Sequence, residues 1–271
     1  MAISLNGSPY RDPDVAEIYR RIAVPTHFVP PARDLCAMLS VKPGDRILDV
    51  GTGTGAFAGA AAERAGPTGF VVGVDRAEAM IRAAHCRDAV RRLVAEAPGL
   101  PFVDDRFDLV GASFVLAHCR HAASALSGMV RVCRPGGRVG ISAWGPMQNE
   151  PGRLWKEIVE KCVDADELQE AFRAVVPWEE WFHVASHVEE ALSDAGLTAV
   201  RSATREYTIE IAPPDYITMK LAGIEGRLIR RLAGESAWDA FTRHIDAEFR
   251  QRFPPRLTFV RDVNIGVGTK R

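Results

Sequence analysis

The sequence lacks an excess of charge of either sign. Its 34 lysine and arginine residues stand against 35 aspartate and glutamate residues, which gives a formal net charge of -1. This balance gives no electrostatic sign of binding to nucleic-acid phosphates or to an anionic membrane. We therefore expect no nucleic-acid partner.

Long apolar runs are also missing. No stretch approaches the roughly 18 apolar residues that a membrane-spanning helix requires. The first residues, MAISLNGSPYRDPD, lack the basic segment followed by an apolar one that marks a signal peptide. We expect a cytoplasmic protein with no membrane span, and the sequence leaves open a monomer or a homodimer.

Cysteine is sparse and shows no pairing pattern. The five cysteines are odd in number and have no CxxC spacing, which argues against a disulfide framework and against a structural zinc site. We expect them to be buried thiols. They are Cys36, Cys86, Cys119, Cys133 and Cys162.

The chain of 271 residues has no internal repeat, and its first helical patterns lie near the N-terminus. Asp12 before Pro13 predicts a helix start and a helix to about residue 22, and Pro30 with Pro31 predicts a second helix over 32–39. From residue 45, apolar strand-like runs alternate with helical stretches, as in a parallel sheet covered on both faces. These runs are RILDV (46–50), FVVGVD (70–75), RRLVAE (91–96), FDLVGAS (107–113) and RVGISAW (138–144).

The alternation stops after residue 145. Helices are predicted over 153–176, 184–195 and about 214–252, and two long strands over 200–211 and 257–268 are predicted to pair antiparallel. We expect a cofactor-binding core at 45–145, completed by strands within 196–212 and 256–271. N-terminal helices (1–44) would cover the cofactor site, and residues 146–195 and 213–255 would form a helical cap and substrate region.

The motif LDVGTGTGAF (48–57) follows a buried strand and has three glycines in five positions. Bare backbone after a strand lets a ligand approach closely, while the next helix offers free N–H groups. Gly51, Gly53 and Ala56 also satisfy the dinucleotide fingerprint G-x-G-x-x-G/A, so a nicotinamide enzyme stays open. Asp49 argues against it, because a carboxylate would repel a pyrophosphate but suit the ammonium and sulfonium of S-adenosylmethionine.

Two further acids end the next strands. Asp75, beside Arg76, lies where a carboxylate can accept hydrogen bonds from two ribose hydroxyls. Glu96 could accept from an adenine amino group while the Ala97 N–H meets a ring nitrogen. Met80 could cover one adenine face, although a methionine at helical spacing is more often core.

Five segments, taken in order, resemble class I S-adenosylmethionine-dependent methyltransferases, closest to the UbiE-like small-molecule group, over about residues 44–145. They are LDVGTGTG, VVGVD, AEAPGLPF, FDLVGASFVLAH and RVCRPGGRVGISAW. The resemblance implies a Rossmann-like doubly wound, mostly parallel sheet of about seven strands with an antiparallel last hairpin strand. It also implies S-adenosylmethionine as cofactor. By motif, it places the methionine moiety at Asp49 and at Gly51, Thr52, Gly53 and Gly55, the ribose at Asp75, and adenine at Glu96 and Ala97. Ser113 or Phe114 would lie near the cofactor and Tyr19 would close over its carboxylate. The family usually has aspartate where this chain has Glu96.

Methyl transfer is an in-line displacement, so the protein must chiefly align the acceptor and exclude water. If a general base is used, His118 is the first candidate, because it follows the fourth strand at the carboxyl edge of the sheet. A histidine bonded to backbone at a helix start is the alternative. His121 is nearby, and His183 with His187 could present two imidazoles on one helix face, but no third ligand accompanies them and we predict no metal site.

Aromatic residues are frequent between residues 144 and 182, and they could line an apolar acceptor pocket or simply form core. They are Trp144, Trp155, Trp178, Trp181 and Phe182, with Met147 beside them. The sequence therefore predicts methyl transfer to a small hydrophobic or aromatic molecule. An NAD(P)-dependent oxidoreductase and a non-catalytic S-adenosylmethionine-binding protein are the alternatives.

Overall fold

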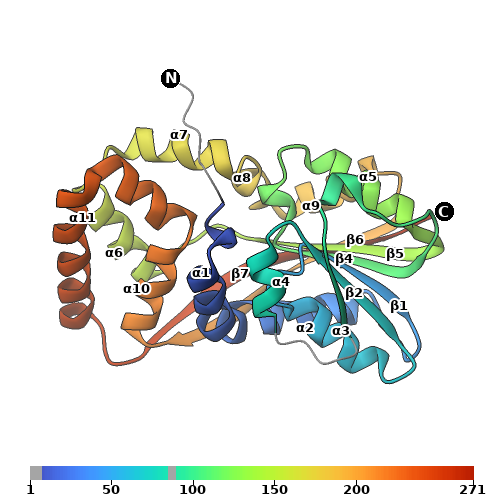
Figure 1. Cartoon of the computed structure of the whole chain (residues 1–271). Helices are drawn as coiled ribbons and strands as arrows, with labels where there is room; N and C mark the ends of the chain where they lie inside the picture. The colour runs from blue at the N-terminus through green and yellow to red at the C-terminus, as the bar shows by residue number, and fades with distance from the viewer. Residues whose placement is uncertain (1–7, 85–89) are drawn as a thin grey trace.

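The computed structural model describes residues 8–84 and 90–271. Its centre is a seven-stranded sheet in the order β3-β2-β1-β4-β5-β7-β6 (Figure 1). The strands are β1 (Arg46–Val50), β2 (Phe70–Asp75), β3 (Val90–Val94), β4 (Phe107–Ser113), β5 (Cys133–Trp144), β6 (Thr198–Ile211) and β7 (Leu257–Thr269). The structure confirms the predicted Rossmann-like sheet, in which β1 to β5 are parallel and β7 is antiparallel to both neighbours.

Helices cover both faces of this sheet. Successive residues of β1 point to opposite faces, so Ile47 packs with one set of helices and Leu48 with the other. The first set is α2 (Val29–Met38) and α3 (Ala56–Ala65), and the second is α5 (Ala122–Val132) and α9 (Ala185–Asp194). Figure 1 shows the two sets on either side of the strands.

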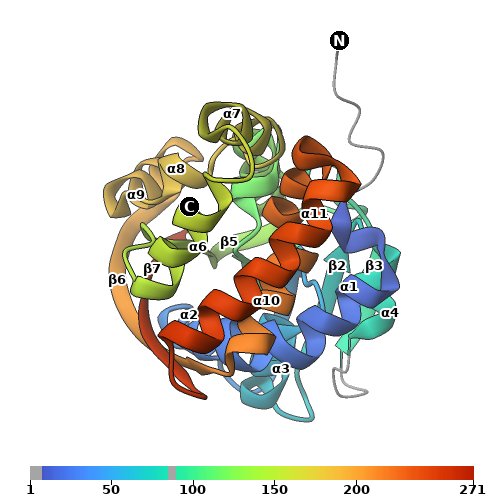
Figure 2. The same ribbon diagram turned by 90° about the vertical axis from the view of Figure 1, so that its left-hand side faces the viewer.

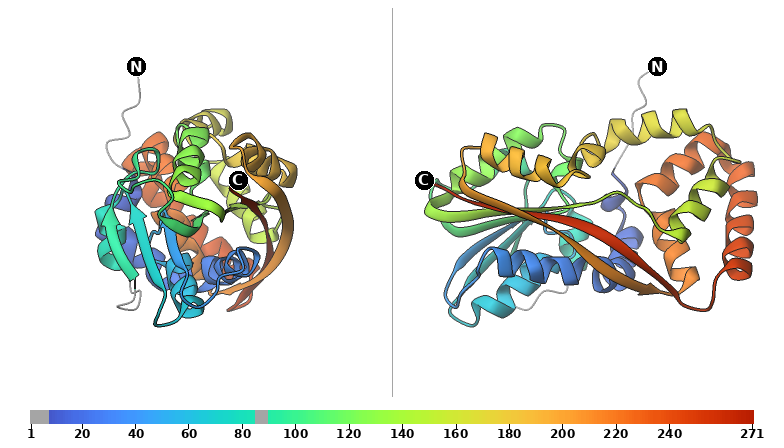
Figure 3. Two further views of the ribbon diagram at one scale, coloured as in Figure 1. Left: turned by 90° about the vertical axis from the view of Figure 1, so that its right-hand side faces the viewer. Right: turned by 180° about the vertical axis from the view of Figure 1, so that it is seen from behind.

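The last two strands extend beyond the sheet. Residues 263–269 of β7 pair with both β5 and β6, whereas residues 257–262 pair with β6 alone. The right-hand view of Figure 3 shows this two-stranded extension running from the sheet to the helices at the other end of the molecule. The antiparallel pairing predicted from the two alternating segments is confirmed.

Those helices form a cap with its own apolar core, built around side chains such as Trp155, Ile229 and Phe241. Figure 2 looks onto the cap. Its helices are α6 (Glu150–Val159), α7 (Ala165–Val175), α10 (Pro213–Ala222) and α11 (Ile224–Arg252), whereas α8 (Glu179–Phe182) packs against the domain core. The single helix predicted over 153–176 is wrong, because Asp164 caps a new helix by accepting a 2.9 Å hydrogen bond from the Glu167 N–H.

The N-terminal segment is helical without a break, unlike the two separate helices that the sequence predicts. It runs through α1 (Pro13–Ile18), a π-helical stretch η2 (Tyr19–Phe28) and α2. Pro25 lies inside η2 and donates no backbone hydrogen bond, because its nitrogen carries no hydrogen, and the helix continues through it with π spacing. The short elements η1 (Pro9–Arg11), α4 (Glu78–Ala83), η3 (Ala97–Gly99) and η4 (Leu116–His118) complete the described chain.

The prediction that the cysteines are buried is confirmed for two of the four that the structure describes. Cys36 and Cys133 are buried, whereas Cys119 and Cys162 are only partly so, and all four are free thiols. Cys86 lies outside the described residues. Among residues 8–84 and 90–271, every helix is too short or too polar to cross a bilayer.

Candidate active site

The glycine loop connects β1 to α3 and turns through backbone conformations that favour glycine. Gly51 has φ +70°, and a Cβ there would come within 2.3 Å of the Val115 side chain. Gly53 has φ +54°, and a Cβ there would meet no atom within 4 Å. The loop therefore presents bare backbone to open space, into which a ligand can approach.

Asp49 lies beneath this loop and is only 1% exposed. Its Oδ2 accepts hydrogen bonds from Thr52 Oγ1 at 2.7 Å and from the Ala58 N–H at 2.9 Å. Its Oδ1 is buried with no hydrogen-bond partner among the described residues. Burial raises the pKa of this carboxyl to about 7, so it would gain from a cationic ligand that contacts Oδ1.

Asp75 ends β2 and faces the same loop. Its Oδ2 accepts from the Gly53 N–H at 2.9 Å and its Oδ1 from the Ala77 N–H at 2.8 Å. Burial raises the pKa of Asp75, and the two backbone donors oppose that rise. The two donors fix the carboxylate and leave each oxygen one further lone pair for a ligand.

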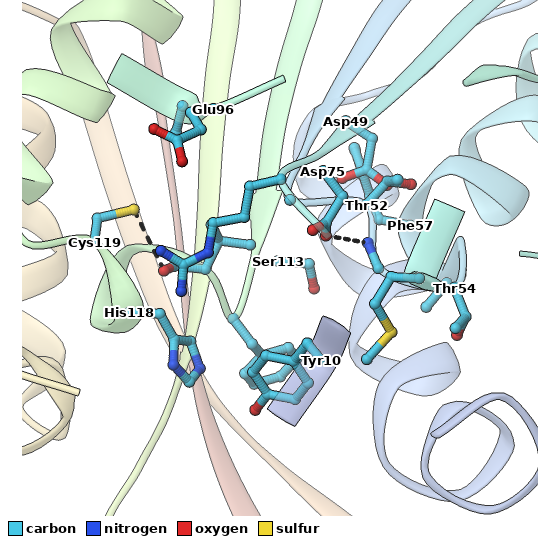
Figure 4. Close-up of a pocket in the computed structure, with 18 of the residues that line it drawn as sticks. Tyr10, Asp49, Thr52, Thr54, Phe57, Asp75, Glu96, Ser113, His118 and Cys119 are labelled. Carbon is cyan, nitrogen blue, oxygen red and sulfur yellow. Dashed lines mark hydrogen bonds between the residues drawn. The ribbon is translucent and has the colours of Figure 1, made fainter. Parts of the chain in front are cut away.

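A cavity of about 380 Å³ opens in front of these acids (Figure 4). It brings together most of the residues that the sequence singles out. They are Tyr19, Asp49, Gly51, Thr52, Gly53, Asp75, Arg76, Met80, Glu96, Ala97, Ser113, Phe114, His118 and His121. Gly55 does not line the cavity and lies at the N-cap of α3 with φ +94°.

The segment after β3 forms another part of the cavity lining. The side chain of Glu96 is exposed and faces the cavity, and Ala97 begins η3 next to it. Met80 is 3% exposed and packs with Ala16 and Ala77 while touching the cavity. The structure thus places these three residues in the lining of the cavity, and their roles stay predictions.

Phe114, at the end of β4, has φ +59°, which is strained for a residue with a side chain. Its ring stacks on Trp144 with centroids 4.1 Å apart and meets Phe28 at 5.2 Å. The neighbouring Ser113 Oγ lies 3.0 Å from Ser142 Oγ. This aromatic cluster holds the strained turn in place at the edge of the cavity.

Residues 47–137 match the model of a methyltransferase domain family. The chain carries a class I S-adenosylmethionine-dependent methyltransferase domain. This match favours the methyltransferase interpretation of the glycine loop over the nicotinamide one. The unpartnered Asp49 Oδ1 and the open space at Gly53 fit a cofactor that carries a positive charge.

Relatives of the methyltransferase domain support the same assignment. The ubiquinone/menaquinone biosynthesis C-methyltransferase UbiE of Burkholderia mallei is 39% identical over 147 residues, which are 52% of this chain and 55% of that protein. The chain thus spans about half the length of the curated relatives that it matches.

Solved structures share the fold at low identity. A protein described as a methyltransferase from an antibiotic biosynthesis pathway of Anabaena variabilis has a TM-score of 0.60 at 15% identity, over 91% of this chain and 99% of that one. The [4+2]-cyclase SpnF has a TM-score of 0.52 at 17% identity, over 89% of this chain and 80% of that one. These similarities show the fold alone.

A second cavity, of about 620 Å³, lies between the methyltransferase domain and the cap helices. Five residues line both cavities, so the two adjoin. They are Tyr10, Tyr19, Phe28, His118 and Trp144. Tyr10 was missed in the sequence, although its hydroxyl lies 3.2 Å from that of Tyr19 and its ring is 5.9 Å from His118. Only the fold of the N-terminal segment brings it there, because no motif marks it.

His118 lies at this junction, with its backbone N–H bonded to Val115 O at 2.9 Å. Burial lowers the pKa of its imidazole, and the nearby charge of Glu179 opposes that change. No described residue forms a hydrogen bond with the ring nitrogens, and Figure 4 shows the ring beside Tyr10. The ring is therefore neutral at neutral pH and free to accept a proton.

Most of the aromatic residues of the cap region are core and do not line an acceptor pocket. Trp155 is 1% exposed and Phe182 2%, and both pack into apolar clusters. Trp178 and Trp181 pack against the domain core, and neither lines the two cavities. Trp144 and Met147 do line the second cavity.

The two histidines on either side of the α9 start serve different local contacts. His187 stacks on Trp181 with ring centroids 4.5 Å apart, whereas His183 lies 3.9 Å from Glu179 and faces the second cavity. Among the described residues, no group of three histidine, cysteine, aspartate or glutamate side chains could hold a metal ion.

Proposed function

We propose that the protein transfers a methyl group from S-adenosylmethionine, bound in the 380 Å³ cavity, to a small acceptor with an apolar body bound in the 620 Å³ cavity. The observation that carries this proposal is that the two cavities adjoin and share His118, Tyr10 and Trp144 among their lining residues. A donor in one cavity and an acceptor in the other would meet at that junction. The proposal covers methylation at oxygen, nitrogen and carbon alike.

In the first cavity, the glycine loop at Gly51, Thr52 and Gly53 would hold the methionine moiety, with Asp49 Oδ1 toward its positive charge. Beside this loop, Asp75 would accept hydrogen bonds from the ribose hydroxyls while the Gly53 and Ala77 N–H groups keep its carboxylate in position.

The remaining predicted contacts complete this cavity. Glu96 and Ala97 would meet the adenine edge, with Met80 against one face. Tyr19 and Phe114, with Ser113 beside the latter, would close the side toward the acceptor.

Bound S-adenosylmethionine supplies an electrophilic methyl group on a sulfonium. The chain must hold the acceptor in line with that group and keep water out, which can lower the barrier by on the order of 7 to 11 kcal/mol. The rings of Phe28, Phe114 and Trp144 pack against one another in the cavity lining and would limit the access of water to the junction. His118 would accept the proton that the acceptor loses, which typically contributes about 10² to 10⁴-fold to the rate.

Calorimetric titration with S-adenosylhomocysteine tests the cofactor site. We expect binding that is weakened in Asp75→Ala and unchanged in Asp246→Ala, a control that removes an exposed aspartate of α11. Heat from NADH and none from S-adenosylhomocysteine would refute the assignment.

Mass spectrometry of reactions with S-adenosylmethionine and a panel of apolar aromatic phenols, amines and acids tests transfer itself. Products that carry one added methyl group in place of a proton, and are therefore heavier by CH2, are expected to form in proportion to S-adenosylhomocysteine. Tight cofactor binding with no methylated product across the panel would favour the non-catalytic alternative.

A further inference from the structure

The second cavity contains an arginine without an acidic partner. Arg261 projects from β7 and lines this cavity but not the first one. Its guanidinium lies over the Trp144 ring, 4.7 Å from the centroid. Among the described residues, none hydrogen bonds to the guanidinium, and its Nε is fully buried without a partner. The two terminal nitrogens are not fully buried, and the residue lines the cavity.

The other cations that line this cavity are already paired. Lys156 lies 3.6 Å from Glu160, and Lys220 forms an ion pair with Glu225. His27 is buried, and burial together with the charge of Arg261 lowers its pKa to about 3, so it carries no charge at neutral pH. Arg261 is therefore the unpaired positive charge of this cavity wall among the described residues.

The acids around the cavity do not neutralise Arg261 by contact. Glu180 is bound by Arg173 at 2.9 Å, and Asp166 is exposed in the first turn of α7. Glu179 is the acid whose charge acts most on the guanidinium, yet the two are not within the 4.0 Å of an ion pair. Burial lowers the pKa of Arg261, and the charge of Glu179 opposes this change without cancelling it. A buried charge in this state is costly unless a ligand supplies the missing acceptor.

Tyr216 adds a second unsatisfied donor in the same cavity. The residue is 2% exposed, and its hydroxyl is buried without a hydrogen-bond partner among the described residues. Its ring meets Phe259 at 5.8 Å, and Phe259 is on the same face of β7 as Arg261, two residues away. Burial raises the pKa of the Tyr216 hydroxyl, and the nearby charge of Arg261 opposes that rise. Both donors thus belong to one wall of the cavity.

We propose that Arg261 and Tyr216 form an anion subsite, and that the methyl acceptor is an apolar molecule carrying a carboxylate that this subsite binds. The inference rests on the proposed function and specifies its acceptor. A planar guanidinium can bind a carboxylate through two parallel hydrogen bonds, and a tyrosine hydroxyl can donate a third. The apolar lining from Phe28, Phe172 and Ile224 suits the remainder of such a molecule.

Binding of matched acids and amides tests this subsite. Benzoate, 2-naphthoate and biphenyl-4-carboxylate, each compared with its primary amide, are titrated into the protein saturated with S-adenosylhomocysteine. At least one acid should bind tenfold or more tightly than its amide. In Arg261→Met the preference should fall below about threefold, and in Tyr216→Phe it should fall by a smaller factor, in line with the weaker single donor that is removed.

Two control variants separate the subsite from general charge effects. Arg256→Met removes an exposed arginine that pairs with Glu210 at 2.9 Å, and it should keep the full preference. Glu179→Gln should keep or increase it, because a repelling charge is removed. Arg261→Lys keeps the positive charge but removes the planar guanidinium that can form two parallel hydrogen bonds, so it should retain only part of the preference for acids. Comparing the binding of 2-naphthoate with that of 2-naphthyl phosphate distinguishes a carboxylate site from a phosphate site.

Each other outcome overturns the inference. Equal binding of acids and amides, no binding of any acid, or an unchanged preference in Arg261→Met would exclude the subsite, and stronger selection of the phosphate would replace the carboxylate. Titration of S-adenosylhomocysteine into Arg261→Met shows that the variant is folded and should match the unmodified protein. A loss of that binding would assign Arg261 to the cofactor instead. Absence of cofactor binding in the unmodified protein would defeat the proposed function itself.

Discussion

Replacement of Asp49 by asparagine separates the charge of this side chain from its shape. The carboxylate accepts hydrogen bonds from Thr52 and Ala58 through Oδ2, while Oδ1 is buried without a partner. An amide oxygen can accept the same two bonds, and the amide nitrogen would take the place of the unpartnered oxygen. The variant therefore keeps the local structure and removes only the charge.

The stability of the ligand-free variant should exceed that of the unmodified protein at high pH. Burial raises the pKa of Asp49 from 3.8 to about 7, so the folded state holds this proton more tightly than the unfolded state. The resulting stability is present below pH 3.8 and is lost as the pH rises toward about 7. The shift corresponds to up to about 4 kcal/mol. Asparagine does not titrate, so calorimetry should show a stability gain of the variant that grows from pH 5 to pH 8.

Cofactor binding should change in the opposite direction. Loss of a charge-assisted hydrogen bond costs about 1.5 to 3 kcal/mol, or roughly 10 to 150-fold in affinity for S-adenosylmethionine at pH 8. In the unmodified protein this affinity should rise from pH 6 to pH 8 as Asp49 ionises, whereas the variant should show little change. Titration calorimetry at both pH values measures this. A variant that is destabilised by more than about 1 kcal/mol yet binds the cofactor normally would show that Asp49 is a structural residue and refute the reasoning.

Further substitutions test other parts of the site. Asp75→Ala should weaken S-adenosylhomocysteine binding by about 1.5 to 3 kcal/mol in calorimetric titration, and an unchanged affinity in the folded variant would contradict the ribose assignment. Trp155→Ala should lower the free energy of unfolding by about 3 to 5 kcal/mol in denaturant titration, because the side chain is 1% exposed, and should leave cofactor affinity intact. At saturating cofactor, kcat should fall below pH 6.5 as His118 gains a proton, since burial holds its pKa under that value. In His118→Gln the rate should drop by about 10² to 10⁴-fold and this acid limb should vanish, and a limb that persists would assign it to another group.

The core of the fold could be predicted because its signals are local. The strand-like runs at 46–50 and 107–113 coincide with β1 and β4, since strands buried on both faces are apolar throughout. Helix boundaries in the cap and in the N-terminal segment were harder to predict. The break at Asp164 depends on one side-chain cap, and the π-helical passage through Pro25 has no clear sequence signature.

The residues of the 380 Å³ cavity could be anticipated one by one, whereas those of the 620 Å³ cavity could not. Asp49, Asp75 and Glu96 each follow or end a parallel strand, and the carboxyl ends of such strands meet at one edge of the sheet. The residues of the second cavity come from segments as distant as Tyr10, Tyr216 and Arg261. No spacing in the sequence relates them.

The sequence by itself determined the alternating core, the glycine loop and the acids around it, because each depends on residues close together in the chain or on the regular geometry of parallel strands. The tertiary structure alone decided which aromatic side chains are core and which face a ligand, since Trp155 and Trp144 differ only in what packs around them. It also decided that Arg261 lacks an acidic partner. An ion pair requires two opposite charges within a few ångströms, and the distance between residues far apart in the sequence is set only by the folded chain.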